Sequence, residues 1–483
     1  MRKILPWHWR NLPLKNRTGS EIFELLFRQN LQENIKGTIA TLLESPNNNK
    51  KDLNTLSRYS ICAGSPRIIA GKHQLWTPKI GKILPFLRDL QTRTAKNNDS
   101  PQLPFTGGWL GWLGYDLAKE IEKIPTLKPD PLPFPVAYWY EPESFAVLDH
   151  WEQKLWLACT NPEDLDKLQS QLDCSVKSKF DPEKQEIINS KLPQISFLTS
   201  KNEYEQAVLA ALKYIKTGDV FQANLSLRFQ STTQKNSWGI YKKLQNLNPS
   251  PFASYWETPW GIVISCSPER LIQLTGRIAR TRPIAGTRSR GIDPETDKKL
   301  ATELLGNVKE RAEHIMLVDL ERNDLGRVCE WGSVVVDELL TIERYSHVMH
   351  LVSNVAGTLR EDCDSVDLIR ALFPGGTITG CPKVRCMEII EELEPVSRSL
   401  FYGSCGYLDQ RGNLDLNILI RTLLLSYDQD DLGATFSRVW GQVGAGIVAD
   451  SDPEKEWYES LHKAEAQLTA LAGCTLDNSL FNR

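Results

Sequence analysis

The segment 219–230, DVFQANLSLRFQ, constrains the fold strongly because its side chains alternate strictly in polarity. The apolar residues from Phe221 to Phe229 would face one side of a β-strand, and the polar residues from Gln222 to Arg228 the other. A strand with one apolar and one wholly polar face usually packs through the first and turns the second to solvent. On this pattern alone we predict a strand whose polar face is in water.

Helix and strand patterns follow one another through 196–474 without a regular strand–helix–strand repeat. Ser200 and Glu203 form a capping-box pattern, and the apolar spacing behind them predicts a helix that ends at Gly218. This irregular order favours an α+β sandwich over a Rossmann sheet. The same reasoning predicts a helix over about 297–321, a strand over 333–340, and a last helix opened by a second capping box, Ser451 to Glu454.

Three regions are expected along the chain. Residues 1–155 contain short strand patterns and turns, and form an N-terminal region. The composition turns polar between about 160 and 200, so we expect a linker over 156–195 that carries one helix. The sharper motifs then occupy a second region, 196–474.

Composition excludes several classes of protein. The 483 residues carry 57 Lys and Arg against 60 Asp and Glu, a net charge of −3, which argues against nucleic acid or membrane partners bound through bulk positive charge. No apolar run approaches the roughly 18 residues that span a bilayer. The ten cysteines contain no CxxC pair, so reduced thiols are expected. We expect a cytosolic (cytoplasmic) protein, or a stromal one if a transit segment was removed.

Two pairs of carboxylates are candidates for a metal site. Glu310 and Glu313 lie three residues apart in one predicted helix, and Glu456 and Glu459 do so in another, so each pair projects from one helix face. Four carboxylates on two helices could bind Mg²⁺, a cation that prefers oxygen ligands. The alternative is that both pairs are solvated helix faces with Lys and Arg partners.

Two glycine-bearing segments are candidates for anion binding. FPGGTITGCPKVR brings backbone amides and Lys383 to a helix entry, and WGQVGAGIVAD offers Gly444 and Gly446. Neither matches a nucleotide-binding fingerprint, and ordinary turn glycines are the alternative.

Three single residues add to these patterns. Glu269 ends an apolar strand, where partial burial would raise the pKa of its carboxyl group into the range suited to proton transfer. Arg421 interrupts an apolar strand and would demand an anionic partner, either a protein carboxylate or a substrate's. His350 lies in an apolar run, where a core histidine is the plainer interpretation. Together these features describe a Mg²⁺-assisted site for a small polycarboxylate.

Ordered segments of the chain resemble the motifs of the chorismate-utilising enzymes, from about 218 to 460. This family includes the large subunits of anthranilate synthase and aminodeoxychorismate synthase, isochorismate synthase and salicylate synthase. TLLESPNNNKKDLNTLSRYS resembles, more loosely, the amino-terminal part of the two ammonia-using members. The matching segments are GDVFQANLSLRF, SPERL, RPIAGTRSRG, ERAEHIMLVDLERNDLGRV, MHLVSNVAG, FPGGTITGCPKVRCMEIIEELEP, ILIRT and GAGIVADSDPEKEWYES.

The resemblance implies an α+β fold of two large antiparallel sheets packed face to face, with helices outside. In that fold the polar face of Gln222, Asn224 and Ser226 would point into the structure, contrary to the pattern alone. It also implies that Glu313 and Glu459 bind Mg²⁺ directly, with Glu310 and Glu456 acting directly or through water.

The same resemblance assigns the substrate contacts. Glu269 would be the general acid or base for the leaving hydroxyl group of chorismate, and His350, Thr287 and Gly286 would line the pocket. The carboxylates of chorismate would be held by Arg421, Lys383 and the backbone amides of Gly444, Ala445 and Gly446.

The residues that separate family members point two ways. Water-using members carry a basic Lys where this chain has Gln222, so ammonia is the expected nucleophile. FPGGTITG and FQANLS resemble aminodeoxychorismate synthase, whereas Ala285 resembles anthranilate synthase, because many aminodeoxychorismate synthases place Lys there. We favour aminodeoxychorismate synthase and keep anthranilate synthase as the alternative. A non-catalytic member would lack Glu269 or a metal-binding glutamate, and all five are present.

Two further expectations concern partners. The chain shows no Gly-x-Cys-x-Gly nucleophile elbow, so it would use free ammonia or receive ammonia from a separate glutamine amidotransferase subunit. Leu42, Glu44 and Ser45 match the segment that binds tryptophan in related enzymes, which makes them a possible tryptophan site.

Overall fold

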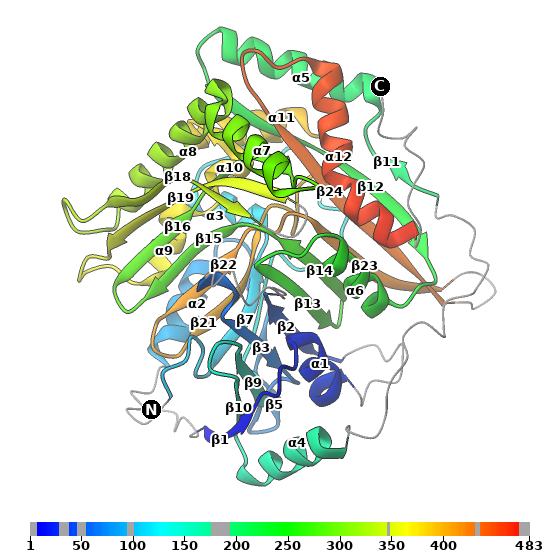
Figure 1. The fold of residues 1–483 in the computed structure, drawn as a ribbon, viewed down its shortest axis with the longest axis vertical. Helices are drawn as coiled ribbons and strands as arrows, with labels where there is room; N and C mark the ends of the chain where they lie inside the picture. The colour runs from blue at the N-terminus through cyan, green and yellow to red at the C-terminus, as the bar shows by residue number, and fades with distance from the viewer. Residues whose placement is uncertain are drawn as a thin grey trace.

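The computed structural model describes residues 7–28, 38–45, 55–93, 101–174, 194–344, 348–429 and 435–472. Within these residues, nearly all strands belong to two large sheets in which every pairing is antiparallel (Figure 1). A separate two-stranded ribbon pairs β4 (Ile68–Ile69) with β5 (Lys72–His73). The predicted α+β class with two large antiparallel sheets is confirmed.

The larger sheet combines strands from both ends of the chain. Its neighbours run in the order β1 (His8–Pro13), β10 (Lys154–Cys159), β9 (Ser144–Asp149), β3 (Tyr59–Ala63), β2 (Ala40–Glu44), β13 (Phe252–Thr258), β14 (Gly261–Ser267), β23 (Thr422–Gln429), β24 (Thr435–Ile447), β12 (Gln222–Thr233) and β11 (Ser196–Phe197), and β20 (Gly380–Cys381) also pairs with β12.

The smaller sheet mixes the two regions in the same way. Its order is β17 (Ile284–Ser289), β19 (Val348–Thr358), β16 (Ile278–Arg282), β15 (Arg270–Thr275), β22 (Leu414–Asn417), β21 (Ser404–Asp409), β7 (Gly108–Leu113), β8 (Ala137–Tyr140) and β6 (Leu75–Trp76), and β18 (Val335–Arg344) also pairs with β19. Since strands from 1–155 and 196–474 share both sheets, the two regions fold together.

An aromatic core joins the two sheets. Trp112 of β7 meets Trp256 of β13 edge to face, with ring centroids 6.0 Å apart. The Tyr140 hydroxyl group of β8 donates a 2.8 Å hydrogen bond to Thr41 Oγ1 of β2, so a buried polar pair also links the sheets. Large aromatic side chains bury much apolar area and favour such edge-to-face contacts, so the sheets are held as a sandwich.

Helices cover the outer faces, and α5, α7, α8 and α12 gather in the upper half of Figure 1. A second apolar core lies between the larger sheet and helices α1, α5, α6 and α12. Among the described residues, no helix combines the length and apolarity needed to cross a bilayer. The α-helices are α1 (Gly19–Phe23), α2 (Ile83–Thr92), α3 (Ala118–Ile121), α4 (Pro162–Cys174), α5 (Lys201–Lys216), α6 (Ser237–Leu247), α7 (Pro294–Gly306), α8 (Val308–Gly326), α9 (Ser365–Leu372), α10 (Gly376–Thr379), α11 (Lys383–Leu393) and α12 (Pro453–Ala472).

Several predicted boundaries need correction. The predicted linker begins too early, because β10 continues to Cys159 and α4 follows it; residues 175–193 lie outside the described residues, as does Cys474. The helix predicted over 297–321 is two helices, since Asn307 ends α7 and caps α8 with its side chain. The eight cysteines whose side chains the structure describes are free thiols, as expected.

The helix caps were predicted with mixed success. The capping box of Ser200 and Glu203 is present at the start of α5. At α12 the side chain that accepts from the first turn is Asp452, which receives the Lys455 amide at 3.0 Å. Ser451 instead donates to Glu456 Oε1 at 2.6 Å, so the second capping box was predicted wrongly.

Candidate active site

Glu269 and Arg421 lie on two neighbouring segments that carry the chain from one sheet to the other. Glu269 separates β14 of the larger sheet from β15 of the smaller, and Arg421 separates β22 of the smaller sheet from β23 of the larger. The two segments are hydrogen-bonded at both ends, by Ile418 N to Glu269 O at 3.0 Å and by Cys266 N to Arg421 O at 3.2 Å. Arg421 has a φ of +53°, a left-handed backbone conformation that non-glycine residues rarely adopt. Such strain persists only where the surroundings enforce it, and it often marks functional sites.

Glu269 is placed as an acid. It is only 5% exposed, and burial raises the pKa of its carboxyl group to about 8. The charge of Glu321 raises this pKa further, while the Thr377 hydroxyl group and the Ile284 amide oppose the shift. The raised pKa agrees with the sequence prediction for Glu269, and donation of its proton to a leaving group stays a prediction.

His350 and Thr287 face each other across the β17–β19 pair. Thr287 Oγ1 lies 3.0 Å from His350 Nδ1, and the two residues are directly opposite in register. Burial lowers the pKa of His350 to about 4, and the charge of Arg421 lowers it further, so the imidazole is neutral at pH 7. Residues from β17, β19 and the two crossing segments therefore meet at one place.

The four predicted glutamates come together between α8 and α12. Burial raises the pKa of Glu313, Lys309 opposes that shift, and the carboxylates of Glu459, Glu310 and Glu456 add to it. The cluster adjoins β17, because a Cβ at Gly286 would lie 2.6 Å from Glu310 Oε2. The charges of the other three carboxylates act on Glu313, so the four glutamates lie in one neighbourhood of the fold.

Each carboxylate of this cluster has a polar neighbour. Arg288 lies 2.8 Å from Glu310, Lys309 lies 4.0 Å from Glu313, and Lys463 lies 2.8 Å from Glu459. The alternative interpretation, glutamates with basic partners, is thus partly present as well. Lys463 also donates to Gly444 O at 3.0 Å, and its own carbonyl group accepts from Arg421, so this lysine connects the cluster to Arg421.

The cluster fits a hard cation in the type and state of its donors. Glu310 Oε2 and Glu456 Oε2 are buried and have no hydrogen-bond partner, and an unpartnered carboxylate oxygen is costly to bury. In the described part of the chain, no three acidic, histidine or cysteine side chains already stand as a metal-binding group. Glu310, Glu313, Glu456 and Glu459 would hold Mg²⁺ only after their carboxylates move closer together, in competition with the basic side chains beside them.

The polar face of β12 is buried, which corrects the prediction from its pattern. Gln222, Asn224, Ser226 and Arg228 all point into the structure, as the family resemblance implied for the first three. Phe221, predicted to pack with the apolar face, precedes the strand and is 69% exposed. The buried Gln222 Oε1 has no hydrogen-bond partner among the residues that the structure describes, so it is available to a ligand.

The glycines of β24 face this polar surface. Gly446 and Gly444 pair with Asn224 and Ser226, and Ala445, which is fully buried, lies between them in the apolar core. A Cβ at Gly446 would lie 2.2 Å from Gln222 Nε2, so a larger residue here would have to displace the end of the Gln222 side chain. Their amides remain predicted substrate contacts.

Comparison with known proteins identifies the family. A family model described as "chorismate binding enzyme" matches residues 40–469. The chain belongs to the chorismate-binding enzymes.

Three relatives within the chorismate-binding enzymes bear on the activity. An "Anthranilate synthase component I-like protein" of Synechocystis sp. is 59% identical over 98% of this chain and 93% of its own length. An "Aminodeoxychorismate synthase component 1" of Bacillus subtilis is 43% identical over 86% and 89%. The same Synechocystis strain has an "Anthranilate synthase component 1" that is 41% identical over 80% and 83%. Anthranilate synthase component I from Streptococcus pneumoniae has a similar crystal structure, with a TM-score of 0.72, 33% identity, and coverage of 85% and 92%.

Lys383, which was predicted to contact the substrate, binds protein oxygens instead. Its ammonium group binds Asp324 Oδ2 at 2.5 Å and Leu372 O at 2.9 Å. The ammonium group is thus occupied by protein oxygens, which differs from the expected contact with a carboxylate of chorismate. The sequence gives no sign of the Asp324 partner, which is 59 residues away.

The possible tryptophan segment lies in β2 and just after it. Leu42, Glu44 and Ser45 are all buried. The Glu44 carboxylate accepts hydrogen bonds from the Ser20 amide at 2.9 Å, the Ser20 hydroxyl group at 2.5 Å and the Tyr241 hydroxyl group at 2.6 Å, and also from Gln245. Glu44 therefore ties α1 and α6 to the sheet, and tryptophan binding stays a prediction that calorimetry can test.

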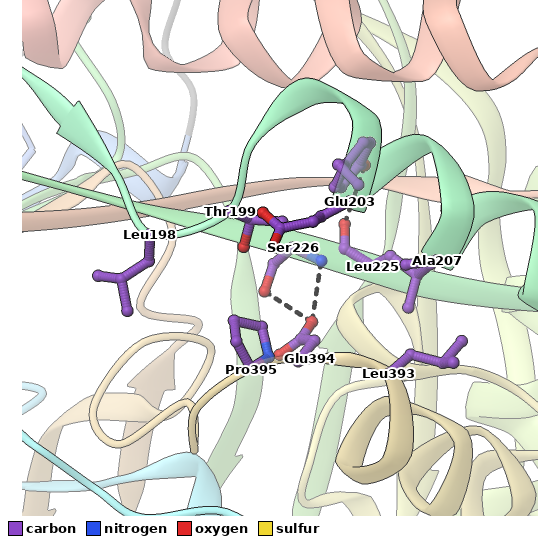
Figure 2. Close-up of a pocket in the computed structure, with 10 residues that line it drawn as sticks. Leu198, Thr199, Glu203, Ala207, Leu225, Ser226, Leu393, Glu394 and Pro395 are labelled. Atoms are coloured by element: carbon purple, nitrogen blue, oxygen red, sulfur yellow. Dashed lines mark hydrogen bonds between the residues drawn. The ribbon is translucent and has the colours of Figure 1, made fainter.

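Figure 2 shows a pocket of about 140 Å³ between the start of α5, β12 and the end of α11. Glu394 accepts hydrogen bonds here from the Ser226 amide at 2.8 Å and its hydroxyl group at 2.7 Å. No candidate catalytic or metal-binding residue lines this pocket, so it is distinct from the site around Glu269. Its lining residues are Leu198, Thr199, Glu203, Tyr204, Ala207, Leu225, Ser226, Leu393, Glu394 and Pro395.

Glu321 is the acidic residue near the site that sequence reasoning missed. It is 5% exposed on α8 and raises the pKa of Glu269. Glu321 was not predicted because the sequence pattern of α8 does not distinguish it from the other residues of its motif. A buried glutamate opposite Glu269 can be found only once α8 and the crossing segments are placed.

Proposed function

We propose that this chain is the large subunit of an aminodeoxychorismate synthase, which converts chorismate and ammonia to 4-amino-4-deoxychorismate in the cytoplasm. The carrying observation is the pair of crossing segments, which places Glu269, whose pKa is raised by burial, and the half-buried Arg421 on neighbouring stretches of chain that are joined by backbone hydrogen bonds. Arg421 makes no ion pair with a carboxylate in the described residues, and burial lowers its pKa. A half-buried arginine that pairs with no carboxylate among the described residues is suited to an anionic substrate.

In this reaction Glu269 donates its proton to the C4 hydroxyl group of chorismate, which leaves as water. Arg421 binds a carboxylate of the substrate, while neutral His350 and Thr287 line the same pocket. Gln222 has no basic nitrogen and cannot deprotonate water, which favours ammonia as the nucleophile. Mg²⁺, bound by the four glutamates, would neutralise the ring carboxylate and assist departure of the hydroxyl group.

Two features favour amination without loss of pyruvate. The loop FPGGTITG, whose Thr377 contacts Glu269, resembles aminodeoxychorismate synthase. The Synechocystis relative at 59% identity is also distinct from the protein named anthranilate synthase component 1 in the same strain, which is only 41% identical to this chain. The names of these relatives as first components also support a separate amidotransferase subunit that supplies ammonia.

One observation favours the alternative, anthranilate synthase component I. Ala285 lies on β17, next to the Ile284 amide that contacts Glu269, so no lysine amine is available at that position. A chain with this residue would have to add ammonia directly. The name of the 59% relative also contains anthranilate synthase.

Product identification decides between the two. The purified chain is incubated with chorismate, Mg²⁺ and ammonium at mildly alkaline pH, with and without an added aminodeoxychorismate lyase, and Glu269→Gln serves as the control. We expect an amino product that retains its pyruvyl group and yields 4-aminobenzoate only with the lyase. Anthranilate with an equal amount of pyruvate, formed without the lyase, would establish the alternative.

A further inference from the structure

Glu321 occupies a prepared position inside the protein. Its carboxylate accepts a 2.9 Å hydrogen bond from Thr281 Oγ1 of β16 and another from the Gly376 amide at the start of α10. A Cβ at Gly376 would lie 2.4 Å from Leu320 Cδ2, so the loop packs tightly on α8 at this point. Three elements therefore fix the orientation of this carboxyl group.

The same loop connects Glu321 to Glu269. Gly376 donates to Glu321, and the next residue, Thr377, places its hydroxyl group beside Glu269. Two adjacent residues thus lie beside two buried carboxyl groups, although Thr377 Oγ1 forms no hydrogen bond of ordinary geometry with any described residue. The interaction is electrostatic as well, because the charge of Glu321 acts directly on Glu269.

The charged groups around Glu321 leave it able to titrate near neutral pH. Burial raises the pKa of Glu321 to about 7; Lys383 lowers this pKa and Asp324 raises it. The Lys383 ammonium group binds Asp324 and Leu372 O, so its positive charge acts on Asp324 as well as on Glu321. Glu321 and Glu269 are consequently two acids with neighbouring titrations, whose protonation steps belong to the pair.

We propose that Glu321 is a positioning residue for Glu269: its carboxylate, fixed by Thr281 and Gly376, keeps Glu269 in the proton-donating form at the pH where the enzyme works. This inference rests on the proposed role of Glu269 as the general acid. A negative charge nearby disfavours a second one, so ionised Glu321 makes Glu269 hold its proton to higher pH. Removing that charge would let Glu269 ionise earlier and shorten the active pH range.

The test is the pH dependence of chorismate consumption by Glu321→Gln, at constant free ammonia and saturating Mg²⁺. Glutamine keeps an oxygen that can accept from Thr281, so the packing is preserved. We expect the loss of kcat at alkaline pH to move to lower pH by roughly one unit, with kcat at the acid end changed less than about threefold. Asp319→Asn is the matched control, because Asp319 lies on the same helix, is exposed and pairs with Arg322 at 3.0 Å. It should leave the profile unchanged.

An alkaline limb that coincides with that of the wild type would overturn the proposal. So would an activity loss of equal size at every pH, which is the signature of a merely structural role. Because the assay follows chorismate, the result does not depend on which product forms.

Thermal unfolding gives a readout that needs no turnover. A folded-state pKa above that of the unfolded chain means that the folded state binds more protons between the two values, so stability falls as pH rises. The Tm of Glu321→Gln relative to the wild type should therefore rise from about pH 5 to pH 8, while Asp319→Asn shows no trend. A flat difference for Glu321→Gln would overturn the proposal even in an active enzyme. An inactive wild type would count against the proposed function, and the Tm trend would still decide whether Glu321 titrates.

Discussion

Two groups of glutamates in this enzyme differ in their solvent exposure and in their charged neighbours. In the four-glutamate cluster of α8 and α12, basic side chains stand beside three of the carboxylates, and the Glu459 side chain is 55% exposed. Glu269 and Glu321 are each 5% exposed, with no direct ion pair among the described residues. In the cluster, Lys463 lowers the pKa of Glu459, while burial raises the pKa of Glu313 and of Glu456. In the buried pair, burial raises the pKa of Glu269 to about 8 and that of Glu321 to about 7.

The difference follows from where each group lies in the fold. The cluster forms between two outer helices, where lysine and arginine side chains reach three of its carboxylates. The buried pair lies where the chain crosses between the sheets, and desolvation there costs more than the nearby charges return. Under the proposed function, the same residue type would hold the metal in one place and donate the proton in the other.

The largest effect is expected from Glu269→Gln. Because loss of a general acid removes about 10²–10⁴-fold of rate, kcat for chorismate consumption should fall by that factor with little change in KM. In the wild type the protonated form is active and burial raises the pKa of Glu269 to about 8, so the rate should fall as pH rises through 8. The variant should lack this alkaline limb.

Glu257→Gln is the control for that experiment. Glu257 is also buried with a raised pKa, caused chiefly by desolvation, but it lies on β13 beside Tyr255 and Arg28, away from the site. It should keep kcat near the wild-type value. Activity of Glu269→Gln within a few fold of wild type would remove the distinction between the two groups of glutamates.

The second effect concerns the cluster. Glu313→Gln and Glu459→Gln should each lower chorismate consumption on the order of 100-fold or more and weaken Mg²⁺ binding measured by calorimetry. Glu454→Gln, on the same helix as Glu459 but paired with Lys201 at 2.6 Å, is the matched control. Unchanged Mg²⁺ affinity in both cluster variants would show that the cation binds elsewhere.

The features of the candidate site that could be predicted from the sequence are those that depend on local helix or strand geometry. Spacing put Glu310 with Glu313 and Glu456 with Glu459 on common helix faces, and position at a strand end predicted the buried acid Glu269. Both inferences need only the local geometry of a helix or strand. Convergence of the two helices on a shared metal site was suggested by the four carboxylates and implied by the family resemblance, and it stays a prediction.

The remaining features depend on distant contacts. The polar face of β12 is buried because Glu394 and Arg398, far along the chain, supply its hydrogen bonds, and no local pattern shows this. Lys383 is bound by Asp324 for the same reason. Glu321 was not predicted because its orientation depends on Gly376, which lies 55 residues later in the sequence, at the start of α10.

Lys383, beside the buried acids, and Lys309, beside the four-glutamate cluster, should differ in their effect on stability. The Lys383 side chain is 11% exposed and pairs with buried Asp324 at 2.5 Å. Lys383→Met would leave Asp324 as a buried charge without a partner, which should lower the free energy of unfolding at pH 7.5 by about 3–5 kcal/mol. Burial already raises the pKa of Asp324, so the loss should shrink at acidic pH as that carboxylate takes up a proton. Urea unfolding at the two pH values measures both effects.

The smallest effect is expected from the same substitution in the cluster. The Lys309 side chain is 51% exposed and lies 4.0 Å from Glu313, so water screens the pair. Lys309→Met should lower the free energy of unfolding by less than about 1 kcal/mol at pH 7.5 without Mg²⁺. Bound Mg²⁺ should offset even this loss, because the metal supplies the positive charge that Lys309 gave to Glu313. The prediction is contradicted if Lys309→Met loses as much unfolding free energy as Lys383→Met, or if Mg²⁺ does not reduce that loss. Either result would mean that Lys309 is as important to the cluster as Lys383 is to the buried acids.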